Sequence, residues 1–211
     1  MKNKTFIILI IIIIIAGVFV YAYKSKTKVV KNSEVVVPTF STYTEPAGTY
    51  SFNYNPLFSV VNGDKSKQTT DWRSNTTTEG TLLTTLTIPR SFMPSTNFSE
   101  AKFTIGRSAD ASVIKSCTTI EKWAGKSSDV FIGGQKFKEV SLSDAGAGNF
   151  YDTTSYRAVL DGDCYVIEYT IHSTNIGNYS PDQGIKEFDK SKIVSELNNI
   201  VQSLKFQLAS N

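Results

Sequence analysis

The sequence predicts an α+β domain, an antiparallel β-sheet covered by a C-terminal helix, preceded by one N-terminal transmembrane helix. Three observations predict this arrangement. Between residues 50 and 171, apolar and polar residues often alternate with a period of two, which is typical of half-buried strands. From Ile193 to Leu204 the apolar residues adopt a helical spacing instead. Near the N-terminus, eighteen residues from Phe6 to Tyr23 carry no charge.

The uncharged segment, residues 6–23, follows a short N-terminal tail at residues 1–5. A helix that rises about 1.5 Å per residue would cover roughly 27 Å here, close to the thickness of the hydrocarbon core of a bilayer. A signal peptide has a shorter apolar region of about 7 to 15 residues, although Val20-Tyr21-Ala22 would suit as a cleavage site. The length therefore favours a retained signal anchor over a cleaved signal peptide, and the lipid bilayer is the first expected partner.

Residues 24–47 form a basic and polar tether that contains Pro38 and Pro46. Its lysines outnumber those before the apolar segment, so the positive-inside rule by itself places the domain in the cytoplasm. The two cysteines, and a chain rich in Thr, Ser, Asn and Tyr, favour the opposite side. We predict a single-pass protein of the cell membrane whose C-terminal domain is extracytoplasmic.

The net charge of the whole chain is +3, but the part that follows residue 31 is acidic. Six of the 22 basic residues lie within residues 1–31, which hold no acid, so the remaining 16 face 19 acidic residues, a net charge of −3. This part of the chain lacks the basic stripe that binding to a phosphate backbone requires. Nucleic acid is therefore not an expected partner.

The domain itself is predicted to occupy residues 48–211, with its first strands around alternating apolar residues: Tyr50, Phe52 and Tyr54, then Leu82, Leu86 and Ile88, then Phe103 and Ile105. A hairpin is predicted from Tyr156–Leu160 and Cys164–Ile171, because Asp161-Gly162 tolerates the positive φ of a tight turn. In its second strand, one face predicted to be core carries Tyr165, Ile167, Tyr169 and Ile171.

The closing helix is predicted from an apolar stripe that comprises Ile193, Leu197, Ile200, Val201 and Leu204. Asp189 suits its N-cap, since a carboxylate accepts hydrogen bonds from the first free amides of a helix. Residues 109–117 suit a second, shorter helix. Strands followed by a helix are typical of an α+β domain whose helix covers one face of the sheet.

Two segments resemble the PsbP/DcrB-like fold family of small extracytoplasmic α+β domains. Residues 52–60, Phe-Asn-Tyr-Asn-Pro-Leu-Phe-Ser-Val, are similar to the family's opening Phe-x-Tyr-Pro-x-x-Trp-x-Val. Asn55 stands in place of the usual Pro, Pro56 follows one place late, and Phe58 replaces Trp. Residues 193–206 are similar to the closing helix and strand. The resemblance implies a fold, and the activities within the family are too varied for it to imply one.

Cys117 and Cys164 are the only cysteines. In an exported domain, two thiols most often form one disulfide, whereas in a cytoplasmic domain they would stay separate and buried. Together with the predicted extracytoplasmic location, this favours a disulfide between Cys117 and Cys164.

Few residues could support catalysis. His172 is the only histidine, and the strand pattern places it as an exposed residue at a strand end. No Gly-x-Ser-x-Gly elbow, clustered zinc ligands or phosphate-binding loop is present in the sequence, so we expect no catalytic residues, no metal and no cofactor. Asp161-Gly162-Asp163 could be read as part of a calcium site, but no Asp-x-Asp-x-Asp-Gly loop with a closing Glu is present, and a tight turn explains Asp161 and Gly162 completely.

Three aromatic residues are the binding candidates: Phe150, Tyr151 and Tyr179. They lie in segments that suit loops, where a large ring supplies contact area at a small entropic cost. The alternative is that these rings pack against the domain itself. The sequence thus favours a membrane-anchored binding or accessory module that contacts an envelope protein or polymer and is not an enzyme. The alternatives are an envelope hydrolase with paired carboxylates and a structural or assembly component of the envelope.

Overall fold

The computed structural model of the protein describes residues 40–63, 80–120, 124 and 127–207. All of them belong to one compact unit, Pro38–Asn211. The predicted anchor at 6–23, and the tether up to residue 39, lie outside these residues. The longer strands and the helices are β4 (Thr81–Ile88), β5 (Phe98–Ser108), α2 (Ala111–Ser116), β6 (Ser127–Ile132), β7 (Gln135–Gly146), β8 (Asn149–Leu160), β9 (Asp163–Thr174) and α3 (Lys190–Ser203). The shorter elements are β1 (Ser41–Thr44), β2 (Tyr50–Tyr54), β3 (Ser59–Asn62), β10 (Lys205–Phe206), and the 3₁₀ turns η1 (Arg90–Phe92), η2 (Ile176–Asn178) and η3 (Pro181–Gln183).

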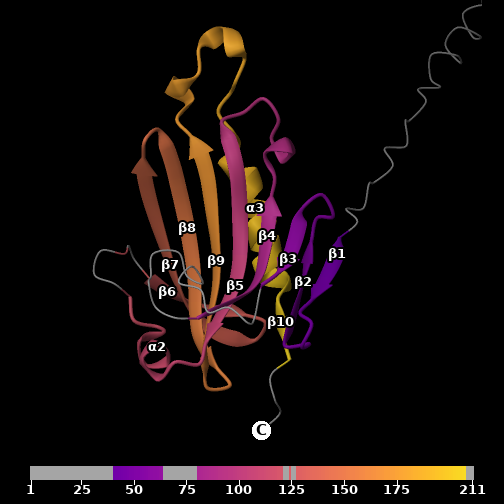
Figure 1. Ribbon diagram of the computed structural model, residues 1–211, viewed down its shortest axis with the longest axis vertical. Helices are drawn as coiled ribbons and strands as arrows, with labels where there is room; N and C mark the ends of the chain where they lie inside the picture. Colours follow the sequence, from indigo (N-terminus) through magenta and orange to yellow (C-terminus); the bar gives the residue numbers. More distant parts are fainter. Residues whose placement is uncertain (1–39, 64–79, 121–123, 125–126, 208–211) are drawn as a thin grey trace, which may run out of the picture. The chain divides into compact units, whose positions relative to one another are not determined.

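The large sheet contains seven strands in the order β3-β4-β5-β9-β8-β7-β6, and every neighbouring pair is antiparallel. Two stretches of chain build it, β3 to β5 and β6 to β9, each made of consecutive strands that pair with one another. The two halves meet where β5 pairs with β9, as Figure 1 shows near the middle of the sheet. The predicted antiparallel sheet is confirmed.

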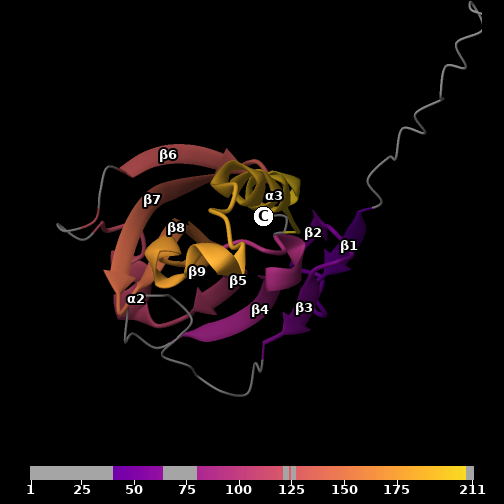
Figure 2. The ribbon, with the colours of Figure 1, turned by 90° about the horizontal axis from the view of Figure 1, so that it is seen from above.

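Helix α3 covers one face of this sheet, called here the inner face, and encloses the main hydrophobic core (Figure 2). The helix buries Ile193, Leu197, Ile200 and Val201. From β9 the core receives Tyr165, Ile167, Tyr169 and Ile171, none of them more than 7% exposed. Both sets were predicted from their periods, because a helix repeats every 3.6 residues and a strand every two.

A small sheet of β1, β2 and β10 adjoins this core, and it corrects one prediction. The tether was expected to continue to residue 47, but Ser41–Thr44 form β1 and pair with β2. Four residues followed closely by Pro46 are too short a run for a periodic signal. Tyr43 holds this strand in place, because its ring packs against the main core.

A chain of hydroxyl groups links the small sheet to β4. The Tyr50 hydroxyl lies 2.6 Å from Thr84 Oγ1, and Thr84 Oγ1 donates to the Tyr43 hydroxyl at 3.0 Å. Tyr50 has no exposed surface, and burial raises the pKa of its phenol well above the usual range. Because these groups satisfy each other, the polar atoms are held inside the core without an unpaired donor.

The predicted hairpin, the short helix and the predicted N-cap of the C-terminal helix are confirmed. Asp161 and Gly162 have φ angles of 49° and 84°, as a two-residue turn between β8 and β9 requires. The short helix α2 begins after Asp110, whose side chain accepts from two amides of its first turn. Asp189 caps α3, and a hydrogen bond from the Ser191 hydroxyl, with others from amides of the first turn, lowers the pKa of its carboxyl.

Within the described ranges, no helix is both long enough and apolar enough to cross a membrane.

Candidate functional site

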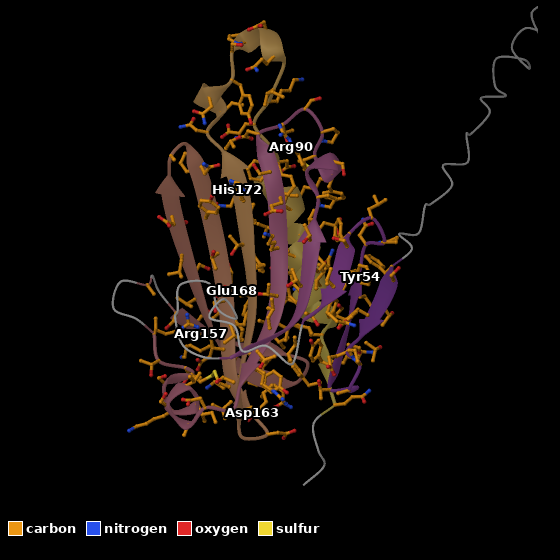
Figure 3. The ribbon with its side chains drawn as sticks, viewed as in Figure 1. Tyr54, Arg90, Arg157, Asp163, Glu168 and His172 are labelled. Atoms are coloured by element: carbon orange, nitrogen blue, oxygen red, sulfur yellow. A yellow bond between two sulfur atoms is a disulfide. The ribbon has the colours of Figure 1, made fainter. Side chains whose placement is uncertain are left out.

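The face of the large sheet that points away from α3, called here the outer face, carries polar side chains in register across β5, β9 and β8. Side chains alternate along a strand, so the residues between the core residues of β9 lie on this face. Strand pairing arranges them in three rows: Tyr151–His172–Glu100, Thr153–Thr170–Lys102 and Ser155–Glu168–Thr104. Figure 3 shows His172, Glu168 and Arg157 at successively lower positions along β9 and β8, above the turn that precedes Asp163.

The lower part of the outer face is covered by α2. The predicted disulfide between Cys117 and Cys164 is present, with a Cα–Cα distance of 5.6 Å, and it ties the end of α2 to the start of β9. Val113 and Val166 pack beside it in a second, smaller apolar cluster. Neither cysteine has any exposed surface. The disulfide therefore fixes α2 onto the sheet.

Two charged side chains are buried on this face. Arg157 is 3% exposed and Glu168 is 4% exposed. The Arg157 guanidinium donates to Ser155 Oγ at 3.2 Å and to the carbonyl oxygen of Thr119 at 3.3 Å. A buried guanidinium that is hydrogen-bonded in this way fixes the position of the chain that follows α2.

The upper part of the outer face is open, and an aromatic pair stands at its end. The rings of Tyr151 and His172 are stacked with centroids 4.6 Å apart and planes at 14°. Asn149 turns its amide nitrogen toward the carbonyl oxygens of Gly146 and Ala147, at 3.4 and 3.2 Å. Its amide oxygen therefore faces His172 Nε2 at 2.8 Å, and Nε2 carries the proton that it donates. This arrangement fixes both rings, while Tyr151 remains 37% exposed.

A cavity of about 270 Å³ runs from this aromatic pair down the three rows, and we call it the outer trough. Its lining comprises Glu100, Lys102, Thr104, Tyr151, Glu168, Thr170 and His172. Lys102 and Glu100 form an ion pair at 3.0 Å. The hydroxyl groups of Thr153 and Thr170 lie 2.8 Å apart. The trough thus combines one fixed aromatic pair with hydroxyl groups, a neutralised pair of charges and the buried Glu168.

A second cavity, of about 370 Å³, has a more acidic lining, which includes Asp144, Phe150, Asp152, Glu187, Phe188 and Lys190. We call it the acidic pocket. Asp152 accepts hydrogen bonds from Lys190 and from Ser143, each at 2.6 Å. Burial acts to raise the pKa of the Asp152 carboxyl, but these two hydrogen bonds outweigh it, so that the pKa is lowered. Asp152 is therefore held in its ionised form.

The three aromatic candidates lie at three different places in the fold. Phe150 and Tyr151 belong to strand β8 rather than to a loop, and as neighbours in a strand they point to opposite faces. Phe150 contributes to the acidic pocket and Tyr151 to the outer trough. Tyr179 does lie in a loop, directly after η2, where its hydroxyl is 2.7 Å from Thr174 Oγ1. The three rings therefore do not form one surface.

His172 was expected to be an exposed residue at a strand end, and only its exposure was wrong. It lies two residues before the end of β9, on the face opposite Tyr165 and Ile167. It is half-buried between Tyr151 and Glu100. The alternative of a calcium site at the β8–β9 turn gains no support, since Asp163 pairs with Arg107 at 3.4 Å. In the part of the chain that the structure describes, no three His, Cys, Asp or Glu side chains gather as metal ligands.

Asn149, Glu100 and Lys102 were not predicted as site residues from the sequence. Glu100 and Lys102 do alternate with core residues of β5, and this pattern could have placed them on the outer face. Their position beside His172 depends on the pairing of β5 with β9, which no local pattern indicates.

Comparisons with known proteins find similarity only in structure. No protein-family model matches the sequence, and no curated protein does. Among solved structures, a protein of Bacteroides thetaiotaomicron VPI-5482 matches with a TM-score of 0.44 and 10% identity over 79% of this chain; the chain spans 48% of that protein. The cyanobacterial PsbP of Synechocystis sp. PCC 6803 matches with a TM-score of 0.39 and 9% identity, over 82% of this chain and 95% of its own.

LpqN of Mycobacterium tuberculosis, a protein involved in cell envelope biogenesis, matches with a TM-score of 0.35 and 7% identity, over 79% of this chain and 90% of its own. A PsbP structure is thus among those that match, as the opening motif of the domain implies. The TM-scores of all three structures lie below 0.5, and such a likeness indicates nothing about activity.

Proposed function

We propose that this chain is a membrane-anchored binding module of the cell envelope, and that its domain holds a partner at the outer trough. One observation carries the proposal. Tyr151 keeps 37% of its surface exposed although its ring is stacked on His172, which Asn149 holds in turn. An aromatic ring that is fixed before binding loses little entropy when a partner covers it. Rings of this kind often dominate the free energy of binding.

The geometry of the trough supports binding rather than hydrolysis. Its two carboxyl residues, Glu100 and Glu168, lie two rows apart, since Glu100 is opposite His172 and Thr104 is opposite Glu168. Four residues along a strand span about 13 Å. Paired carboxyl groups in glycoside hydrolases are about 5 to 9.5 Å apart. Glu100 also forms an ion pair with Lys102, which neutralises it.

Site-specific photo-crosslinking in intact cells tests the proposal. A benzophenone amino acid at Tyr151 should form a crosslinked product that depends on irradiation, because this position contacts the partner. The matched control is the same amino acid at Val159, which lies on the same strand and is 45% exposed. Equal products at both positions, or none at Tyr151, would contradict a partner at the outer trough.

The location belongs to the same proposal. We place residues 6–23 in the membrane as a retained anchor and the domain on the extracytoplasmic side. The support is the length of the uncharged segment and the presence of a disulfide, which persists in oxidising compartments.

The location is tested with a membrane-impermeant thiol reagent on intact cells that carry either Ser210→Cys or Asn3→Cys. Cys117 and Cys164 can stay in place, because both are buried and bonded to each other. Labelling of Ser210→Cys alone is expected. Labelling of Asn3→Cys alone would place the domain in the cytoplasm.

A hydrolase is a second candidate function, because the acidic pocket brings Asp144, Asp152 and Glu187 to one cavity. Asp152 cannot be the general acid there, since its lowered pKa keeps it ionised. Asp144 or Glu187 would then have to supply the proton. If hydrolysis of an envelope polymer is detected, at least one of Asp144→Asn and Glu187→Gln should abolish it, and Tyr151→Ser should leave it unchanged. Activity that survives both carboxyl substitutions would eliminate this candidate.

A further inference from the structure

We infer that the ligand of the outer trough is an uncharged saccharide chain. This inference rests on the proposed function, and it adds the chemical class of the partner. Three properties of the trough lead to it: the aromatic pair, the hydroxyl groups of its floor and the neutralised charges.

The aromatic pair suits one face of a sugar ring. A pyranose presents C–H groups on its faces and hydroxyl groups around its rim. The C–H groups carry a small positive partial charge, and the face of an aromatic ring is negative. Tyr151 is held in one orientation by its stack on His172, and its exposed surface borders the trough. A sugar ring can therefore pack on Tyr151 without reordering the site.

The floor suits the rim of the same ring. Thr104 and Thr170 line the trough. Thr104 Oγ1 donates to the carbonyl oxygen of Glu168 at 3.3 Å and Thr170 shares a hydrogen bond with Thr153, but each hydroxyl oxygen keeps lone-pair capacity to accept from a sugar hydroxyl. Glu100 adds acceptors and Lys102 adds donors, and hydrogen bonds to charged groups are the stronger ones. Such a floor can satisfy several hydroxyl groups of one ligand when it displaces water.

The charges disfavour an ionic ligand. Lys102 and Glu100 are paired at 3.0 Å, so a polyanion would meet Glu100 and a polycation would meet Lys102 at the same place. Glu168, the third charged residue of the lining, is only 4% exposed and offers little surface to an ionic ligand. Among the described residues, the trough also has no Leu, Ile, Val or Met in its lining. Protein interfaces have an apolar core and bury about 800 Å² per partner. A peptide surface therefore matches the trough less well than a sugar chain does.

The size indicates a short stretch of a longer polymer. The volume of about 270 Å³ is just below the roughly 300 to 1,000 Å³ of clefts that enclose drug-sized ligands. The trough is elongated, because its three rows extend over about 13 Å of strand. A linear chain that lies along β9 would place one ring on Tyr151 and the next over Thr170 and Thr104.

The test is isothermal titration calorimetry with the full chain in a zwitterionic detergent that has no sugar headgroup. The neutral probes are cellotetraose, maltotetraose and N-acetylchitotetraose; the charged probes are tetragalacturonate and tetralysine. We expect one or more neutral tetrasaccharides to bind with a Kd in about the micromolar to millimolar range, as suits a small open site. Neither charged probe should bind more tightly.

Three variants locate the binding. Tyr151→Ser should weaken it by about tenfold or more, while Tyr151→Phe, which keeps the ring, should stay within about threefold. Val159→Ser is the matched control and should bind as the native chain does. Thermal unfolding followed by circular dichroism must give Tyr151→Ser a melting temperature close to that of the native chain, since the ring is partly exposed.

The outcomes separate this inference from the proposed function. If no neutral tetrasaccharide binds at millimolar concentration, or if Tyr151→Ser binds as tightly as the native chain, the inference is wrong. Tighter binding of tetralysine or tetragalacturonate would also overturn it. In either case, a protein crosslinked at Tyr151 in cells would still support the proposed binding function. If no crosslinked product forms, the proposed binding function is contradicted as well as the saccharide inference.

Discussion

Removal of the disulfide should cost the domain a large part of its stability. The double substitution Cys117→Ala/Cys164→Ala opens a link between residues that are 47 positions apart. In the chain-entropy model, a loop of that length is worth about 4 kcal/mol, because the link restricts the unfolded chain. Domains of this size are usually stable by about 5 to 15 kcal/mol. We therefore expect a clear fall in the urea midpoint of the domain Pro38–Asn211.

The control separates the link from the packing around it. Val113 is buried in the same small cluster, and Val113→Ala removes two carbon groups worth about 1.6 kcal/mol at 0.8 kcal/mol each. The double cysteine variant should lose clearly more free energy of unfolding than Val113→Ala does. A loss below about 1 kcal/mol would refute the reasoning, because it would mean that the link does not constrain the unfolded chain.

Three further predictions concern the core and the helix cap. Leu197→Ala should cost about 3 to 5 kcal/mol in urea unfolding, because the side chain has no exposed surface, whereas Asn199→Ala on the exposed side of α3 should change stability by less than about 0.5 kcal/mol. Tyr50→Phe should cost about 1 kcal/mol, and its combination with Thr84→Val should cost less than the sum of the two single losses; strict additivity would contradict the shared hydrogen bond. Asp189 has a lowered pKa in the folded state, so its contribution is present above the unfolded pKa of about 4 and is lost as pH falls through the folded value. Asp189→Asn keeps a capping oxygen and should lose less stability in acid; identical acid unfolding curves would count against this.

Local patterns in the sequence were enough to predict the elements that depend on short-range physics. The helix at Lys190–Ser203 and its cap follow from one apolar stripe and one carboxylate. The β8–β9 hairpin follows from Asp161-Gly162, since few residue pairs tolerate two positive φ angles. The disulfide followed from the number of cysteines together with the expected compartment.

The candidate site depends on contacts that no local pattern reveals. Tyr151 was identified as a recognition residue from its aromatic ring, but it was assigned to a loop because Gly146 and Gly148 precede it closely. The structure extends β8 back to Asn149, so that Phe150 and Tyr151 face opposite sides. The partners of His172 come from β5 and β8 and depend on strand register, which is set by the whole sheet.

The junction of β5 with β9 also bears on the order of folding. Each half of the large sheet consists of consecutive strands, whose pairing closes only short loops, whereas β5 and β9 are separated by α2 and three strands. Contacts between distant segments form slowly, because chain entropy is lost before the contacts are gained. Tyr151 and His172 belong to one half, and Glu100, Lys102 and Thr104 belong to the other. The outer trough is therefore complete only after the slowest pairing has formed, so a partner that needs both halves selects molecules that have finished folding.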